Sequence, residues 1–475
     1  MMSLATLRRY AARALTPAFL AFALLVGGAS LEGDFLKAVL FALSGVLLAG
    51  LFLFAGPWWK GPVAVVAVFA GLLAVLLVVQ VVPLPPGWVG DLPVREAAGK
   101  SLEALGLGPG PAALSLAPEA TVAGLLAFLA PFCGFALVAA VKWSRGAGLL
   151  KWVIPALGAA SAALGLAQVI LGKAMPELYF YDFTSPGLPV GVFSNPNHQA
   201  SFLLMCLPFV AVLAADLRRD WEGSDEDAAL SLVAGVLGLM ILAGILGAGS
   251  AAGYLLLVPV LVLSLAAAFA GRRKSQDRAA GGRLAGLAIA AIVLGFAALV
   301  VFTSPRLTGL GYTSFEDGPA SRIGINRVSA VMIEDHWAAG TGLGAYQDVY
   351  RLYEDPDTVS RVFIAHAHND YYEWVIETGL AGSVLLGGFL LVWSYWFLRL
   401  WTGSGADALR LRRAASIACL VPVLHSLVDY PLRTPGIAVL AAMCLALMIV
   451  PRQRSEAPLP EAEQSGDEAL RTVTL

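Results

Sequence analysis

The sequence predicts an all-α polytopic membrane protein with about 12 transmembrane helices and a large outward loop between late spans. Of its 475 residues, 58% are hydrophobic and 13% are charged, whereas soluble domains carry about 25% charged residues. Crossing a bilayer takes roughly 20 apolar residues. Twelve apolar runs approach this length, at 15–31, 35–56, 62–82, 120–141, 149–171, 198–215, 229–247, 253–271, 284–303, 379–400, 414–430 and 436–451.

These runs divide the chain into four parts. Residues 1–303 hold spans 1 to 9, and the first run is expected to be an uncleaved helix because no convincing cleavage site follows it. Residues 304–378 form the large polar loop, with short helices and the expected active site. Residues 379–451 hold spans 10 to 12, and the polar tail at 452–475 is expected to be disordered and cytoplasmic.

Positive charge indicates the orientation. With the N-terminus in the cytoplasm, 21 of the 31 Lys and Arg residues fall on the cytoplasmic side and 10 on the other. Because cytoplasmic connections are enriched in Lys and Arg, both termini are expected to be cytoplasmic. The large loop then lies on the periplasmic face of a bacterial inner membrane.

The four cysteines lie inside apolar runs without a CxxC pair, at Cys133, Cys206, Cys419 and Cys444. This placement is typical of small packing residues and excludes a disulfide framework or a cysteine metal site. No sequence pattern indicates a cofactor, a metal ion or a nucleic-acid partner, and the net charge of −2 favours no class of partner. Membrane lipids are the expected surroundings.

The first half of the large loop predicts a helix. In SRIGINRVSAVMIEDHW (321–337) the apolar residues recur at helical spacing, which favours a helix at the membrane interface. It carries Arg322 and Arg327, which could simply reach lipid headgroups or pair with nearby acids (Glu316, Asp317, Glu334, Asp335). The glycine-rich GTGLGAY (340–346) that follows predicts a chain reversal, and no nucleotide loop, because no Lys-Ser/Thr follows it.

The loop ends in HAHNDYYEWV, starting at His366. A histidine titrates near neutral pH, so His366 or His368 suits general acid-base chemistry better than metal binding here. Asn369 and the acids after it stand close enough in sequence to orient such a base. The alternative is a capped helix start, with Asn369 or Asp370 as N-cap and the aromatic residues at the membrane interface.

Four segments together resemble the O-antigen ligase / O-antigen polymerase superfamily of bacterial integral membrane glycosyltransferases. They occur in the family's order: GVFSNPNHQASFLLMCLP (191–208), SRIGINRVSAVMIEDHWAAGTGLGAYQ (321–347), His368-Asn369 followed after nine residues by Gly379-Leu-Ala-Gly382, and HSLVDYPLRTP (425–435). Trp337 stands where the family usually has proline. The resemblance spans roughly residues 60–450.

The resemblance implies transfer of a glycan from an undecaprenyl-diphosphate carrier to a glycan or lipid acceptor, without metal or nucleotide. Arginine suits the diphosphate and histidine suits the acceptor hydroxyl. The implied catalytic residues are Arg322 and His368. The expected substrate-binding residues are Arg327, His366, Asn369, Asn195 and Asn197. His425 and Asp429 are expected to be buried near a span end, where an ionisable side chain without a partner costs free energy.

One departure concerns the GAGSAAGYLLL segment (247–257), where Ala251 occupies the place of an arginine common in O-antigen ligases. Arg351, Arg361 or Arg433 would have to replace that charge. The chain is therefore open to a ligase, a polymerase or a related transferase. Two other classes stay open: a secondary transporter or lipid flippase, disfavoured by the nearly uncharged spans, and a non-catalytic scaffold for envelope-polymer assembly.

Overall fold

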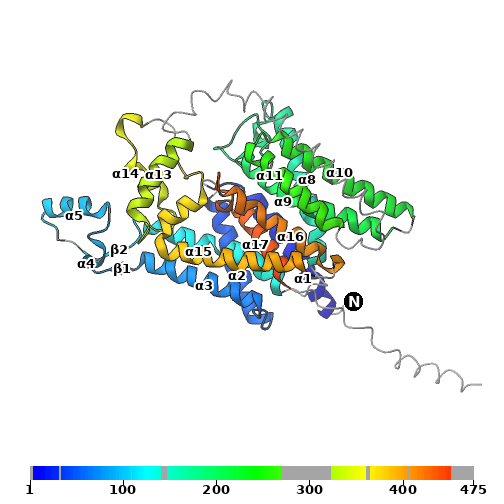
Figure 1. Ribbon diagram of the computed structural model, residues 1–475, viewed down its shortest axis with the longest axis horizontal. Coiled ribbons are helices and arrows are strands. Elements are labelled where there is room, and N and C mark those ends of the chain that lie inside the picture. The colour runs from blue at the N-terminus through cyan, green and yellow to red at the C-terminus, as the bar shows by residue number, and fades with distance from the viewer. Residues whose placement is uncertain are drawn as a thin grey trace, which may run out of the picture.

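The computed structural model describes residues 4–30, 34–108, 110–140, 147–221, 223–269, 322–359, 364–403 and 406–450. The described chain is almost entirely helical (Figure 1). Its first helices and strands are α1 Leu4–Val26, α2 Asp34–Phe54, α3 Pro62–Val81, β1 Pro83–Leu84, α4 Pro86–Val89, α5 Arg95–Ala104, β2 Ala112–Ala113, α6 Pro118–Ala127, α7 Leu129–Ala140 and α8 Ala147–Leu171. The later elements are the short 3-10 turn η1 Pro176–Leu178, α9 Pro196–Arg219, α10 Asp225–Gly247, α11 Ala251–Phe269, α13 Arg322–His336, α14 Tyr346–Tyr353, η2 Pro356–Thr358, α15 Asp370–Thr402, α16 Ala406–His425, η3 Pro431–Arg433 and α17 Pro435–Ile449.

Eight helical segments in the described residues are long and apolar enough to cross a membrane. They are Asp34–Phe54, Pro62–Val81, Pro118–Ala140, Gly148–Leu171, Pro196–Arg219, Asp225–Gly247, Ala251–Phe269 and Asp370–Thr402. Two shorter apolar helices, Ala14–Val26 and Pro435–Ile449, coincide with the first and last predicted runs. The multi-pass helical class is thus confirmed, while the count of twelve stays a prediction. The run at 284–303 lies outside the described residues, and the run at 414–430 falls largely on α16, which is not among these candidate spans.

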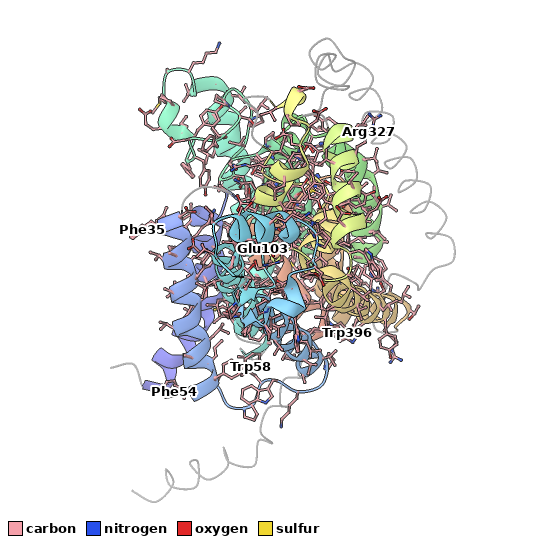
Figure 2. All side chains as sticks on the ribbon, turned by 90° about the vertical axis from the view of Figure 1, so that its left-hand side faces the viewer. Phe35, Phe54, Trp58, Glu103, Arg327 and Trp396 are labelled. Atoms are coloured by element: carbon pink, nitrogen blue, oxygen red, sulfur yellow. The ribbon has the colours of Figure 1, made fainter. Side chains whose placement is uncertain are left out.

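The core lies around α9, whose side chains are buried on nearly every face. Helices α8, α10, α11 and α16 pack against α9, and α17 packs against α7 and α16. By contrast, α2 runs along the edge of the molecule, with Phe35 and Phe54 exposed near its two ends (Figure 2). The four cysteines are buried free thiols.

The Pro-rich connection after α3 contains structure that the sequence did not predict. Residues 83–84 pair antiparallel with 112–113 in a two-stranded ribbon, and α4 and α5 lie between these strands. This hairpin projects from one end of the bundle in Figure 1. Arg95 closes its base, because its guanidinium donates to the backbone oxygens of Ala113 and Leu114.

The predicted helix and chain reversal of the large loop are both present, as α13 and the turn at 340–345. This turn is joined to a kink in α15, where Gly379 has φ 62° instead of a helical value. The kink frees two carbonyls of α15, and the amides of Thr341 and Gly342 donate to those of Ile376 and Glu377 at 2.9 Å each. Only glycine fits at Gly379, because an added Cβ would lie 2.7 Å from the Ala338 oxygen. The joint therefore fixes α13 against the first turns of α15.

Candidate functional site

Three distant segments converge on the carboxylate of Asp429, which is fully buried in the loop after α16. Arg322, at the first residue of α13, places Nη2 3.5 Å from Oδ2 of this carboxylate. His368, just before α15, places Nδ1 3.6 Å from Oδ1. Asn197, in the first turn of α9, donates from Nδ2 to Oδ2 at 2.6 Å. One anion therefore connects three of the residues predicted from sequence.

Burial alone would raise the pKa of Asp429. The hydrogen bonding and charge of His368, together with the charges of His198 and His425, outweigh that effect and hold this pKa well below its usual range. The carboxylate is therefore an anion at neutral pH. A fixed anion next to imidazole rings orients them and stabilises their protonated form.

The backbone presents His368 to the cluster through an uncommon conformation. His368 has φ 51°, in the left-handed region that few non-glycine residues adopt. The next residue, Asn369, is the N-cap of α15, and its side-chain oxygen accepts from the amides of Tyr371 and Tyr372. The predicted cap is thus confirmed, and it coexists with the histidine cluster. Strain of this kind is maintained where surrounding contacts over-determine it, as at functional sites.

Tyr430 stands at the centre of the histidines. Its ring centroid lies 4.2 Å from that of His366 and 5.1 Å from those of both His198 and His368. Within the described chain, three buried ring nitrogens in this region have no hydrogen-bond partner: Nε2 of His198, His366 and His425. Buried polar atoms are normally paired, so this concentration indicates a site built for polar chemistry.

A second cluster lies beside the first and is centred on Arg433. Its three guanidinium nitrogens each contact a different carboxylate: Nε lies 3.4 Å from Asp370, Nη1 3.0 Å from Glu373 and Nη2 2.8 Å from Glu377. Burial alone would lower the pKa of Arg433, but the three carboxylates raise it well above its usual value. Arg433 is therefore a permanent cation whose three guanidinium nitrogens already contact carboxylates.

The Arg433 cluster also positions its neighbours. Glu373 accepts from Nδ1 of His366 at 2.8 Å and from the amide of Ala367 at 2.9 Å. Glu377 accepts from the amides of Gly344 and Tyr346, in the glycine-rich turn. Through these hydrogen bonds, the two carboxylates paired with Arg433 also fix the segment before α15 and the loop after α13.

The structure brings together most, but not all, of the predicted site residues. Arg327 does not join the cluster: it is exposed on α13, at the outer edge in Figure 2. At 100° per residue, five residues put it about 140° around the helix from Arg322, so one helix face cannot present both. Asn195 is the N-cap of α9, where its side chain accepts from the Asn197 amide and bonds Tyr430.

Among the described residues, neither Glu334 nor Asp335 pairs with Arg322; Asp429, more than 100 residues away, takes that place. Glu316, Asp317 and Arg361 lie outside the described residues. Arg351 is exposed on α14. Sequence reasoning left Tyr430 and Glu377 out of the site, although a charged residue beside a span was a usable signal for Glu377. It considered Glu373 only as a residue that orients a histidine, and Arg433 only as a replacement for the charge absent at Ala251.

No group of three or more His, Cys, Asp or Glu residues that could hold a metal ion occurs in the described parts of the chain. Residues 235–387, about a third of the chain, match the family model described as O-antigen ligase. This region contains both Arg322 and His368. The comparison with curated proteins gave no match.

Proposed function

We propose that this chain, a member of the O-antigen ligase superfamily, transfers a glycan from an undecaprenyl-diphosphate carrier to an acceptor hydroxyl at the Asp429 cluster. The observation that carries this proposal is the convergence of Arg322, His368 and Asn197 on one buried carboxylate. The first two lie inside the region that matches the family. Residues so far apart in sequence have no local reason to meet there.

In the proposed reaction, the acceptor oxygen attacks the anomeric carbon while the bond from that carbon to the diphosphate oxygen breaks. His368 accepts the proton of the acceptor hydroxyl, and Asp429 stabilises the resulting imidazolium. Arg322 contacts the diphosphate, whose negative charge grows as it leaves. Half of the Arg322 side chain is exposed (51%), so it has room for an anionic ligand in addition to Asp429.

The other predicted residues receive positioning roles. His366 is held by Glu373 and packs on Tyr430, and Asn197 anchors Asp429 to α9. Asn369 caps α15 immediately after His368. We place the reaction on the periplasmic face of the inner membrane, with both termini cytoplasmic and no metal ion involved. The positive-inside distribution of Lys and Arg supports this orientation.

The test compares wild type with Arg322→Ala and His368→Ala in a host lacking its own surface-polysaccharide ligase or polymerase. Arg327→Ala is the matched control, because it removes an arginine from the other side of the same helix. We expect carrier-linked glycan to accumulate with the first two variants only, with all proteins inserted at equal amounts. Because His368→Ala removes the proposed general base, we expect it to slow glycan transfer by about 10²–10⁴-fold.

The product of the active protein then separates the possible acceptors. A ladder of increasing glycan length on the carrier indicates a polymerase, and loss of glycan to another lipid indicates a ligase. If His368→Ala and Arg322→Ala turn over like wild type, the assigned site is wrong, and transport or scaffolding explains the protein better.

A further inference from the structure

A groove of about 730 Å³ lies between α9 and α10, remote from the histidine cluster. On α9 it is lined by Ala211, Ala214 and Arg218, whose spacing of three and four residues places them on one helix face. Arg218 is 22 residues from Pro196, where α9 begins beside the Asp429 cluster. At 1.5 Å per residue this is about 33 Å, the thickness of the bilayer core. The arginine end of the groove thus lies at the opposite leaflet.

The groove is deep because its walls have small side chains. Ala234, Gly235 and Gly238 face it from α10, so the two helices leave a trench that is apolar along most of its length. Both helices are candidate membrane spans. A trench between two candidate membrane spans lies at the depth of the lipid chains, so a lipid chain is the apolar occupant available to it.

Three polar or aromatic groups mark the end of the trench near Arg218. Arg218 is exposed, and none of the described residues forms an ion pair or hydrogen bond with it. Trp221 completes the rim, a residue type enriched at headgroup depth. Ser231 lines the trench, and its hydroxyl oxygen is buried without a hydrogen-bond partner among the described residues.

Among the described residues, nearby carboxylates do not neutralise Arg218. Asp216 is engaged by Lys151 at 3.1 Å and by Arg410 at 3.4 Å. Asp220 pairs with Arg219 at 3.5 Å. The acidic first turn of α10 lies one to two turns before Ser231 and does not line the groove. Within the described part of the chain, one cation and one hydroxyl thus lack a polar partner at this end of the apolar trench.

We propose that this groove is a binding site for an anionic phospholipid of the leaflet opposite the histidine cluster. An acyl chain occupies the trench between α9 and α10, and the phosphate contacts Arg218. Basic residues between membrane helices recognise lipid phosphates in this way. The site is independent of the glycan chemistry, since it lies at the other end of α9.

The test measures lipid binding to the purified full chain in detergent by native mass spectrometry. The probes are phosphatidylglycerol and an uncharged diglycosyl diacylglycerol with the same acyl chains. One arginine near a lipid phosphate contributes a binding free energy that corresponds to an affinity increase of about fivefold. We expect wild type to prefer phosphatidylglycerol by about this factor and Arg218→Gln to lose the preference. Arg219→Gln is the matched control, because Arg219 is next to Arg218 but pairs with Asp220. We expect this variant to retain the preference for phosphatidylglycerol.

A second variant tests the trench itself. Gly235→Leu adds a side chain where nothing lies within 4 Å of an added Cβ, so the fold is expected to tolerate it. It should weaken binding of both lipids, with thermal unfolding in lipid-free detergent unchanged. Equal binding of the two lipids to wild type would overturn the proposal, as would equal losses from Arg218→Gln and Arg219→Gln. Tighter binding of a polyprenyl phosphate than of phosphatidylglycerol would overturn the choice of occupant.

Discussion

The Asp429 and Arg433 clusters lie next to each other and use the same kinds of residue, yet their charge balance is opposite. Around Asp429, one carboxylate faces an arginine and several histidines. Around Arg433, one guanidinium faces three carboxylates. The exposed fraction of the side chain is 51% for Arg322 and 18% for Arg433. Only the first cluster can accept an added anion, so one is suited to binding a diphosphate and the other to holding the fold.

The largest expected effect comes from removing the central cation of the closed cluster. Arg433→Met leaves three buried carboxylates without their counter-ion, which should destabilise the protein by about 3–5 kcal/mol. Arg322→Met should cost less stability, because His368 and Asn197 remain to hold the Asp429 carboxylate when Arg322 is removed. Thermal unfolding of both variants in detergent measures the difference. Equal losses of stability would remove the distinction between the two clusters.

The next effect concerns the carboxylate of the open cluster. Asp429→Asn preserves the shape but removes the anion that stabilises a protonated His368. We expect the transfer rate to fall by at least about 10²-fold, as when the orienting acid of a catalytic histidine is replaced. The loss should appear in kcat with little change in KM. Asp348→Asn, an exposed acid on α14, is the control, and a loss confined to KM would contradict the assigned role.

The joint between α13 and α15 predicts a smaller effect on stability. Gly379→Ala requires a left-handed alanine and places its Cβ 2.7 Å from the Ala338 oxygen, so we expect a loss of at least about 1–2 kcal/mol. Gly387→Ala in the same helix meets nothing within 4 Å and should stabilise slightly, by about 0.5–1 kcal/mol. Chemical denaturation of the pair checks both signs. A stable Gly379→Ala protein would mean that the kink is not required.

A conservative change at Arg322 separates charge from geometry. Arg322→Lys keeps the positive charge but loses the planar fork that contacts phosphate at two points. We expect KM for the carrier-linked donor to rise about tenfold, because the variant loses one hydrogen bond to a charged phosphate oxygen. Steady-state kinetics with purified donor would measure it, and an unchanged KM would argue against diphosphate contact by Arg322.

The pH dependence of stability gives the smallest effect. Because the pKa of Asp429 is lowered in the folded protein, its stabilising contribution is complete above the unfolded value of about 3.9. It is lost as the pH falls through the folded value. The stability difference between wild type and Asp429→Asn should therefore not shrink from pH 7 to about pH 4, and it should shrink below. A difference that shrinks between pH 7 and 5 would show that Asp429 is not held as an anion.

The sequence by itself determined the membrane class, most of the spans and the segments that hold the candidate site. Apolar length and helical spacing are local properties, so α13, the turn after it and the Asn369 cap follow from the residues themselves. The family motifs likewise indicated Arg322 and His368 one by one.

Only the tertiary structure decided which of these residues meet. Arg322 and Asp429 are more than 100 residues apart, and no local pattern specifies that pairing. The same holds for the enclosure of Arg433, which in sequence is simply one more arginine near a span. The physical reason is that burial and charge pairing arise from packing between distant helices, whereas sequence patterns report the preferences of each segment alone.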